Sequence, residues 1–382
     1  MARLSTSKQI KPNFKLKMSE EFIMQMRPFF GEEEKKALAE YMEEDGFLTE
    51  FKRTEVFEEM IADFTSSKHC IVVNNGTISL TLAAIALEIK PGDEVIVPNY
   101  TMIATPNSVK MIGAKPIFVD VEEESLCLDI NKVTESITSK TKAIILVSSN
   151  GRYPKTRIKE FTQLAKKHKI SLIEDAAQSL GSFYPNGKHI GTVGDIGSFS
   201  FSAPKIISTG QGGALITNND KLAKRLRKLK DFGRTSGGND IHDEIGFNFK
   251  FTELQACIGI EQMKKLNARI IRKKEIWSKY SEQLDDIEEV KLFDHDLKCT
   301  SPWFIDSIVE KREQLMAFLK RNNIGSRIMY PPINKQKAYN IEGPFSVSSM
   351  IGKKGLWFPS SIQLSDEQII HICKIIRKFY KK

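Results

Sequence analysis

The sequence predicts an α/β fold, in which a mostly parallel sheet lies between helices and is followed by a smaller α+β domain. Short apolar runs alternate with helical stretches from residue 70 onward, and apolar strands separated by helices are typical of a parallel sheet covered on both faces. The pattern changes after a long helical stretch that ends near residue 285. A length of 382 residues accommodates two such domains.

The first expected element is a helix within 31–46, after a basic segment without periodicity. Its sequence, GEEEKKALAEYMEEDG, is acidic at the start, and Gly46 is placed to end it. Seven apolar segments then predict strands. They lie at 70–73, 94–98, 115–120, 143–147, 171–175, 197–202 and 213–217. Helical periodicity separates most of the first five, as in IKEFTQLAKKHK at 158–169.

The remaining elements belong to the end of the chain. A long helical pattern follows FTELQACIGIEQMKKL, and the segments after it are SPWFIDSIV, a helical REQLMAFLKRNN, SRIMYPPIN and a final helix, SDEQIIHICKIIRKFYKK. We therefore expect a basic extension at 1–24, a large domain at 25–265 and a small domain at 266–382.

Composition and charge exclude several classes of protein. Hydrophobic residues make up 41% of the chain and charged residues 27%, an ordinary globular balance. The net charge of +9 favours anionic partners. The basic residues are dispersed and form no recognised nucleic-acid-binding motif, so we expect no nucleic-acid partner. No apolar run approaches the roughly 20 residues of a membrane span, so we expect no membrane association.

The five cysteines are spread widely, without a CxxC pair or a histidine spaced for zinc. This distribution favours reduced thiols over a disulfide framework and predicts no metal site. The basic start of the chain lacks the apolar stretch of a secretory signal. We therefore expect a cytoplasmic protein.

Three segments could carry chemistry. In VVNNGTISL at 72–80 a strand ends and a helix begins. Free N–H groups at a helix start, with Gly76 allowing close approach, can cradle a phosphate. The alternative is an ordinary helix cap by Thr77.

The second segment, SLIEDAAQSLG at 171–181, ends an apolar strand in two acids. A carboxylate at the carboxyl end of a parallel strand points toward the crevice where α/β proteins bind ligands. Because side chains alternate along a strand, only one of Glu174 and Asp175 can face that crevice. The alternative is that one of them caps the next helix.

The third segment, GSFSFSAPKIISTGQGG at 197–213, places Lys205 in a turn after a strand and before a glycine-rich stretch. Such a lysine can form a Schiff base, although most lysines are solvated surface charges. A pyridoxal phosphate enzyme needs a phosphate cradle, an acid beside the pyridine nitrogen and a lysine in one crevice. The three segments together supply all of them.

The sequence resembles the DegT/StrS family of nucleotide-sugar aminotransferases, over about residues 25–380. Further segments that carry the resemblance are DGFLTEF, GDEVIVP, GAKPIFVDV, GDIGSFSF, GFNFKFTELQACIG and FPSSIQLSDEQI. The TGQGG run and the C-terminal segments are most similar to the perosamine synthase-like branch, which aminates carbon 4 of a 4-keto-6-deoxy sugar. The resemblance implies a fold-type-I transferase that uses pyridoxal 5'-phosphate (PLP). It also implies L-glutamate as amino donor and a nucleoside-diphosphate 4-keto-6-deoxy sugar as acceptor.

The resemblance also assigns roles to residues. Lys205 matches the lysine that forms the Schiff base and then transfers protons, and Asp175 matches the partner of the pyridinium nitrogen. Gln178 stands where the family contacts the phenolic oxygen of the cofactor. The residues that match phosphate ligands are Gly76, Thr77, Ser200 and, from a neighbouring subunit, Asn248. A homodimer with active sites at its interface follows from the last of these.

This chain departs from the family pattern at three places. Met102 stands where an aromatic residue usually stacks on the cofactor ring, and a thioether can still pack there. The stretch 148–152, Ser-Ser-Asn-Gly-Arg, replaces the usual His-Leu-Tyr-Gly, and Asn334 replaces a histidine. The residues expected to bind the sugar nucleotide are Arg152, Lys250, Tyr330 and Asn334, and for Arg152 and Lys250 a solvated surface role is the alternative.

Other activities of the same fold remain open from the sequence. A sugar 3-dehydratase of this family carries histidine in place of the Schiff-base lysine, whereas this chain has Lys205. A 3-aminotransferase and a non-catalytic sensor are further alternatives, although Lys205, Asp175 and Gln178 together argue against the sensor. The nucleotide and the epimer formed at carbon 4 are not determined by these patterns.

Overall fold

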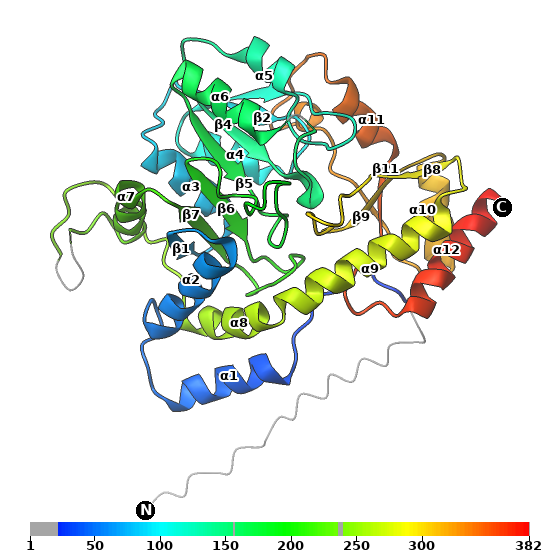
Figure 1. Ribbon diagram of the computed structural model, residues 1–382, viewed down its shortest axis with the longest axis horizontal. Helices are drawn as coiled ribbons and strands as arrows, with labels where there is room; N and C mark the ends of the chain where they lie inside the picture. Colours follow the sequence, from blue (N-terminus) through cyan, green and yellow to red (C-terminus); the bar gives the residue numbers. More distant parts are fainter. Residues whose placement is uncertain (1–21, 156, 236–239, 382) are drawn as a thin grey trace, which may run out of the picture.

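A computed structural model describes residues 22–155, 157–235 and 240–381, and the basic extension before residue 22 lies outside them. Its larger sheet has the strand order β1-β7-β6-β5-β4-β2-β3 (Figure 1). The seven strands are β1 (His69–Val73), β2 (Glu94–Pro98), β3 (Lys115–Val119), β4 (Thr141–Val147), β5 (Ser171–Asp175), β6 (Ile196–Ser200) and β7 (Gly213–Thr217). Strand β7 is antiparallel to both its neighbours, and the other pairs are parallel. The predicted α/β fold and its seven strands are confirmed.

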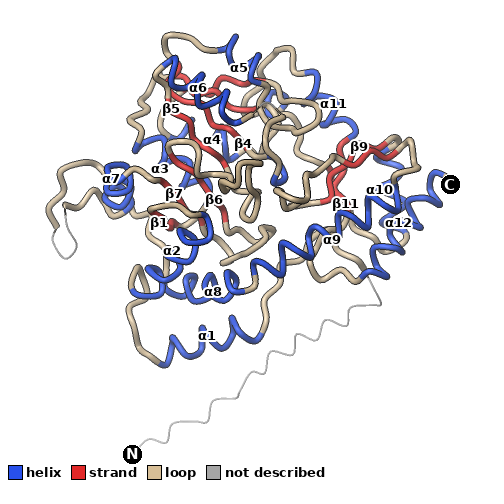
Figure 2. The backbone as a smooth tube through the Cα atoms, in the orientation of Figure 1, coloured by secondary structure: helices blue, strands red, loops and turns tan. Residues whose placement is uncertain are grey.

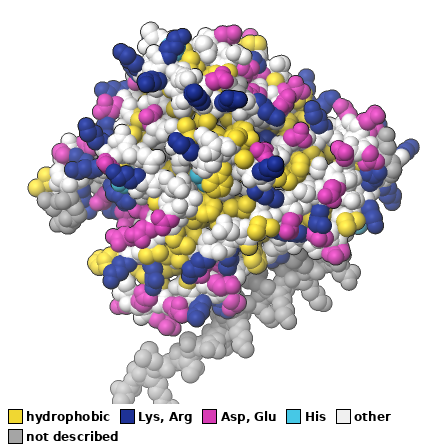
Figure 3. All heavy atoms as spheres, viewed as in Figure 1, with side chains coloured by type: hydrophobic (Ala, Val, Ile, Leu, Met, Phe, Trp, Pro, Cys, Tyr) yellow, Lys and Arg dark blue, Asp and Glu magenta, His cyan; other side chains and the backbone are white. Residues whose placement is uncertain are grey.

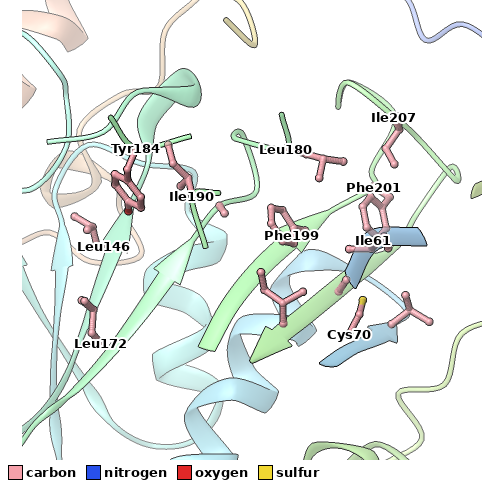
Figure 4. Packing of buried hydrophobic residues seen from close by; sticks show 14 of the residues in the cluster. Ile61, Cys70, Leu146, Leu172, Leu180, Tyr184, Ile190, Phe199, Phe201 and Ile207 are labelled. Atoms are coloured by element: carbon pink, nitrogen blue, oxygen red, sulfur yellow. The ribbon is translucent and has the colours of Figure 1, made fainter. Parts of the chain in front are cut away.

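Helices cover both faces of this sheet because its strands are apolar on both sides. Alternate strand residues enter two separate hydrophobic clusters, as Ile144 and Ile145 of β4 do. Figure 4 shows part of the first cluster, where Phe199 and Phe201 lie near Ile61. The first cluster includes residues of α2 (Lys52–Thr65), α6 (Ile158–His168) and α8 (Glu253–Lys264), and the second includes residues of α3 (Gly76–Ala86), α4 (Ala104–Met111) and α7 (Asp220–Lys230). A further helix, α5, spans Ile130–Ser136.

The first helix, α1, spans Glu32–Glu43, and the prediction that Gly46 ends it is wrong. The residue that leaves the helix in the left-handed conformation is Asp45, with φ of 52°. Gly46 lies beside the ring of Tyr41, where an added Cβ atom would be 2.9 Å from the hydroxyl oxygen. The glycine is therefore needed for this close contact and not for the turn of the backbone.

The chain after α8 builds a second, antiparallel sheet in the order β10-β11-β9-β8. Figure 2 shows helix α9 running from the large sheet toward this small one. The elements are α9 (Leu266–Leu284), β8 (Val290–Leu292), β9 (Ile305–Val309), α10 (Arg312–Arg321), β10 (Arg327–Ile328), α11 (Ser346–Lys354), β11 (Gly355–Phe358) and α12 (Asp366–Tyr380). Ile23 pairs with Ile324 in an isolated bridge, so the start of the described chain packs beside α10. The domain limits stay a prediction.

Candidate active site

The site is a cavity of about 360 Å³ at the carboxyl ends of β5 and β6, where they meet the start of α3. Residues of the second sheet region close its other side. Its walls include Gly76, Thr77, Met102, Thr105, Asp175, Gln178, Ser200, Ser202, Lys205, Gln211, Trp303, Arg327 and Tyr330. Three predicted segments that are far apart in the sequence thus line one cavity.

Asp175 is the last residue of β5, and its side chain is buried. Strand alternation places it on the face covered by α4, where Thr105 donates a hydrogen bond to one carboxylate oxygen (2.8 Å) and the Ala177 N–H donates to the other (3.2 Å). Burial raises the pKa of Asp175, and the two hydrogen bonds and the Lys205 charge oppose that rise. The carboxyl group is therefore poised to pair with a cation that enters the cavity.

Glu174 lies on the opposite face of β5 and is fully buried. It accepts hydrogen bonds from the Tyr184 hydroxyl (2.6 Å) and from the N–H groups of Gly191 (2.9 Å), Val193 (2.7 Å) and Gly194 (2.6 Å). These bonds hold the loop between β5 and β6. Of the two acids, Asp175 alone faces the cavity, and neither caps a helix.

Replacing Glu174 by alanine should lower the free energy of unfolding by at least about 3 kcal/mol, because four donors, two of them fully buried, lose their acceptor. Denaturant unfolding followed by circular dichroism measures this change. Glu160→Ala, which alters an exposed acid on α6, should stay within about 0.5 kcal/mol of wild type. Equal stability of the two variants would contradict the role given to Glu174.

Lys205 lies in the turn after β6, where its N–H donates to the Ser202 carbonyl (3.0 Å). Its amine is 4.2 Å from the centre of the Trp303 ring. Burial lowers the pKa of Lys205 from 10.5 to about 8, and the charge of Asp175 opposes this shift. A lysine with a lowered pKa presents more neutral, nucleophilic amine at neutral pH than a solvated one.

The start of α3, where the sequence predicts a phosphate cradle, borders the cavity. Asn75, not Thr77, caps the helix by accepting a hydrogen bond from the Ile78 N–H (2.9 Å). Thr77 therefore does not cap the helix. Thr77 and Ser200 both line the cavity. A Cβ atom on Gly76 would lie 2.7 Å from the Cβ of Ser200, so only glycine allows helix and strand to meet here. A helix start beside hydroxyl groups suits a phosphate, and the acid and amine nearby suit the rest of PLP.

Gln178 is oriented by a neighbouring loop. Its Oε1 accepts a hydrogen bond from the Asn150 N–H (2.6 Å), so its Nε2 is the end left to donate toward a ligand. Asn150 has a left-handed backbone, with φ of 54°, and its side chain bonds both the N–H (2.6 Å) and the carbonyl (2.8 Å) of Phe304. Met102 also lines the cavity, and the residue is 43% exposed.

Two predicted residues lie on the stretch before α8 and do not line this cavity. Asn248 is exposed, and its backbone pairs with Asp231 in an isolated bridge. Lys250 forms an ion pair with the same aspartate (2.6 Å) and lies 4.7 Å from the ring centre of Phe232. Within one chain, these residues are not brought to Lys205.

Arg152 and Asn334 are also outside the cavity, and each is buried with its polar atoms paired. Arg152 binds Asp306 of β9 through two hydrogen bonds (2.6 and 3.2 Å), which join the end of β4 to the small sheet. Asn334 and Asn99 exchange hydrogen bonds of 3.0 and 2.9 Å. The structure therefore does not support the expectation that these two residues bind the sugar, nor a solvated role for Arg152. Tyr330 does line the cavity.

Replacing Arg152 by methionine should cost about 3–5 kcal/mol of stability, because Asp306 would remain buried without its partner. Adding Asp306→Leu should recover much of that loss, since no unpaired charge is left. Thermal and denaturant unfolding of the single and double variants measure both effects. A variant that folds as stably as wild type but binds substrate weakly would instead support a sugar-binding role.

Several residues of the cavity wall were not among the predicted site residues, including Thr105, Ser202, Gln211, Trp303 and Arg327. Thr105 and Trp303 come from elements that carry no motif of their own. A search for polar residues one helical turn from Thr101 could have found Thr105, since the two hydroxyl groups are 3.0 Å apart.

In residues 22–155, 157–235 and 240–381, no group of three His, Cys, Asp or Glu side chains is placed to hold a metal ion. None of the helices in these ranges has the length and apolar character needed to cross a membrane. Figure 3 shows one face, on which basic and acidic side chains are interspersed.

Comparison with known proteins places the chain among aminotransferases. Residues 28–377 match the DegT/DnrJ/EryC1/StrS aminotransferase family. The chain is 34% identical to the GDP-perosamine synthase of Escherichia coli O157:H7, over 94% of this chain and 99% of that protein. It is 32% identical to the GDP-perosamine synthase of Vibrio cholerae, over 92% and 98%. Among solved structures, DesV from S. venezuelae superposes with a TM-score of 0.86 at 29% identity, over 92% of this chain and 95% of DesV.

Proposed function

The chain belongs to the DegT/DnrJ/EryC1/StrS aminotransferase family and uses pyridoxal phosphate, and we propose that it aminates carbon 4 of a nucleoside-diphosphate 4-keto-6-deoxyhexose. L-Glutamate is the proposed donor, and the products are 2-oxoglutarate and a 4-amino-4,6-dideoxy sugar of the viosamine or perosamine type. The observation that carries the proposal is the shared cavity of Lys205, Asp175 and the start of α3. The similarity to two GDP-perosamine synthases supports the choice of carbon 4.

Each residue of the cavity has a chemical task in this proposal. When bound, the cofactor supplies a ring that absorbs the electrons left when a proton leaves the donor carbon. Asp175 would hold a proton on the ring nitrogen by its opposite charge. Lys205 would bind the cofactor through its amine and later move a proton between the donor carbon and the cofactor. Thr77 and Ser200 would bind the phosphate, and Gln178 would donate to the phenolic oxygen.

The sugar nucleotide would enter past Tyr330 and Arg327, which line the same cavity. Arg327 is exposed, and its guanidinium lies 5.5 Å from the ring centre of Trp357. A planar cation held against an aromatic ring suits the diphosphate of the substrate. We propose Arg327 for that contact, in place of Arg152.

We also propose a homodimer in which Asn248 of each copy contacts the cofactor phosphate bound by the other copy. Exposed apolar side chains support this assembly, since such groups favour burial between subunits. They are Phe47, Leu48 and Phe51 near α2, and Ile245 and Phe247 beside Asn248.

Mixing Lys205→Ala protein with Asn248→Ala protein should then restore one working site per mixed dimer. Lys250 would keep Asp231 paired beside the segment that carries Asn248.

We propose a cytoplasmic location, where the cysteines stay reduced.

The proposal is tested by product analysis. Purified enzyme is incubated with L-glutamate and UDP-, GDP- or dTDP-linked 4-keto-6-deoxyhexoses, and products are identified by mass spectrometry and NMR. We expect an amino group at carbon 4 of one of these sugars and release of 2-oxoglutarate. Amination at carbon 3, loss of the carbon-3 hydroxyl or no product with any of the sugars would contradict it.

A further inference from the structure

Lys273 is a buried cation on α9 that does not line the cavity. The residue is 2% exposed, and its ammonium donates hydrogen bonds to the carbonyl oxygens of Trp303 (2.6 Å) and Ser360 (2.5 Å). Burial lowers the pKa of its amine from 10.5 to about 7. Removing an ammonium group from water is costly, and a packed apolar side chain would avoid that cost. The position therefore points to a role beyond filling space.

Trp303 connects Lys273 to the active site. Its carbonyl accepts from Lys273, and its indole N–H donates to the Pro204 carbonyl (2.7 Å), one residue before Lys205. The ring centre is 4.2 Å from the Lys205 amine. Lys273 thus holds the backbone of Trp303, while the face of the Trp303 indole covers the amine of Lys205.

The neighbouring residue makes this arrangement rigid. Phe304 stacks on Trp303 with ring centres 3.8 Å apart, and Asn150 bonds both backbone groups of Phe304. Within this fixed segment, the Trp303 carbonyl is the group that Lys273 satisfies. Without Lys273, two buried carbonyls would lose their donor, and the segment would have to shift to find another.

We propose that Lys273 is a positioning residue for the Lys205 amine, acting through Trp303. The proposal rests on the proposed function, in which Lys205 is the reacting amine. The indole face limits access to that amine and stabilises its protonated form, because the ring carries negative charge on its face. Holding the ring in place therefore sets how readily Lys205 reacts.

The test measures the reactivity of Lys205 in the enzyme loaded with pyridoxamine phosphate, in which this amine is free. A trace of an amine-acylating reagent is added at neutral pH, and mass spectrometry of peptides gives the acylation rate of each lysine. Lys273→Met should accelerate acylation of Lys205 about fivefold, as expected when an aromatic cover on an amine is lost. Lys273→Arg, which keeps donors for both carbonyls, should restore the slow rate.

The controls separate positioning from general loosening. Arg272→Met removes a neighbouring cation on α9 that bonds Asp366 (2.9 Å) and the Leu364 carbonyl, and it should leave Lys205 unchanged. The buried Lys230, bound to Glu50 (2.7 Å), serves as an internal reference. Unchanged acylation of Lys205 in Lys273→Met, or an equal acceleration of Lys230, would overturn the proposal.

Two further measurements keep the outcome clear. Trp303→Phe removes the indole N–H but leaves Lys273 intact, so it should also accelerate acylation of Lys205 even if the Lys273 variant does not fold. A slow rate in that variant would overturn the proposal. Borohydride reduction of the wild-type PLP form is done first, and cofactor that is not found on Lys205 would contradict the proposed function itself.

Discussion

Lys205→Ala is expected to lower kcat by at least about 10³-fold, because in the proposed function the variant loses both the amine that binds the cofactor and the group that moves the proton. The proposed phosphate contacts with Thr77, Ser200 and the start of α3 would remain, so the loss should lie mainly in kcat. Steady-state assays with L-glutamate, and absorbance changes of the bound cofactor when glutamate is added, measure the effect.

Lys250→Ala is the matched control for this experiment. Lys250 is a cation paired with Asp231 outside the cavity of its own chain, so its removal should leave the reaction of glutamate with the cofactor near the wild-type rate. Small primary amines should partly restore turnover to Lys205→Ala, because they can take over proton transfer in the space left by the side chain. Near-normal turnover of Lys205→Ala without such amines would exclude the assigned role.

The lowered pKa of Lys205 also predicts an effect on stability. The folded cofactor-free protein binds this proton less tightly than the unfolded chain, since the pKa falls from 10.5 to about 8. The lysine therefore lowers stability at neutral pH, and this penalty disappears as pH rises through the interval between those two values. Lys205→Met should raise the unfolding temperature of the cofactor-free protein at neutral pH and leave it little changed above that interval. A lower unfolding temperature at neutral pH would contradict this.

The large sheet could be predicted because each strand is a short buried apolar run, and such runs stand out locally. Contacts between distant residues carry no such signal. Gly46 has the spacing of a helix-ending glycine, yet Asp45 takes the left-handed position while Gly46 packs on Tyr41. Strand β11 is missed because its four residues lie directly after α11 without a turn signal of their own.

The candidate site likewise could be predicted where the signal is local and could not where it depends on contacts between distant residues. Strand alternation narrows the choice to Glu174 or Asp175, but only the fold decides, because Glu174 binds a loop that comes later in the chain. Arg152 has the charge expected of a phosphate ligand, and its partner Asp306 is 154 positions away. Trp303 was missed for the same reason, since its contact with Lys205 exists only after the small sheet has packed on the large one.

Asp175→Asn is expected to lower the rate of the reaction with glutamate by about 10²–10⁴-fold, because a neutral amide cannot hold the proton of the ring nitrogen by charge. Stopped-flow absorbance of the bound cofactor measures this rate. Thr105→Val removes only one hydrogen bond from the carboxylate (2.8 Å), so we expect a smaller loss of about tenfold. An Asp175→Asn rate equal to wild type would show that this carboxylate does not meet the ring.

The same substitution should stabilise the protein without cofactor. Burial raises the pKa of Asp175 above its ordinary value of 3.8, so the folded state binds the proton more tightly than the unfolded chain. The ionised carboxylate therefore costs stability that grows as pH rises from 3.8 through the folded pKa, and asparagine removes this cost at neutral pH. Unfolding of cofactor-free wild type and Asp175→Asn at several pH values measures the difference. If Asp175→Asn gains stability and loses activity, the acid is present for its chemistry. Substitution of a residue retained for folding would instead lower both stability and activity.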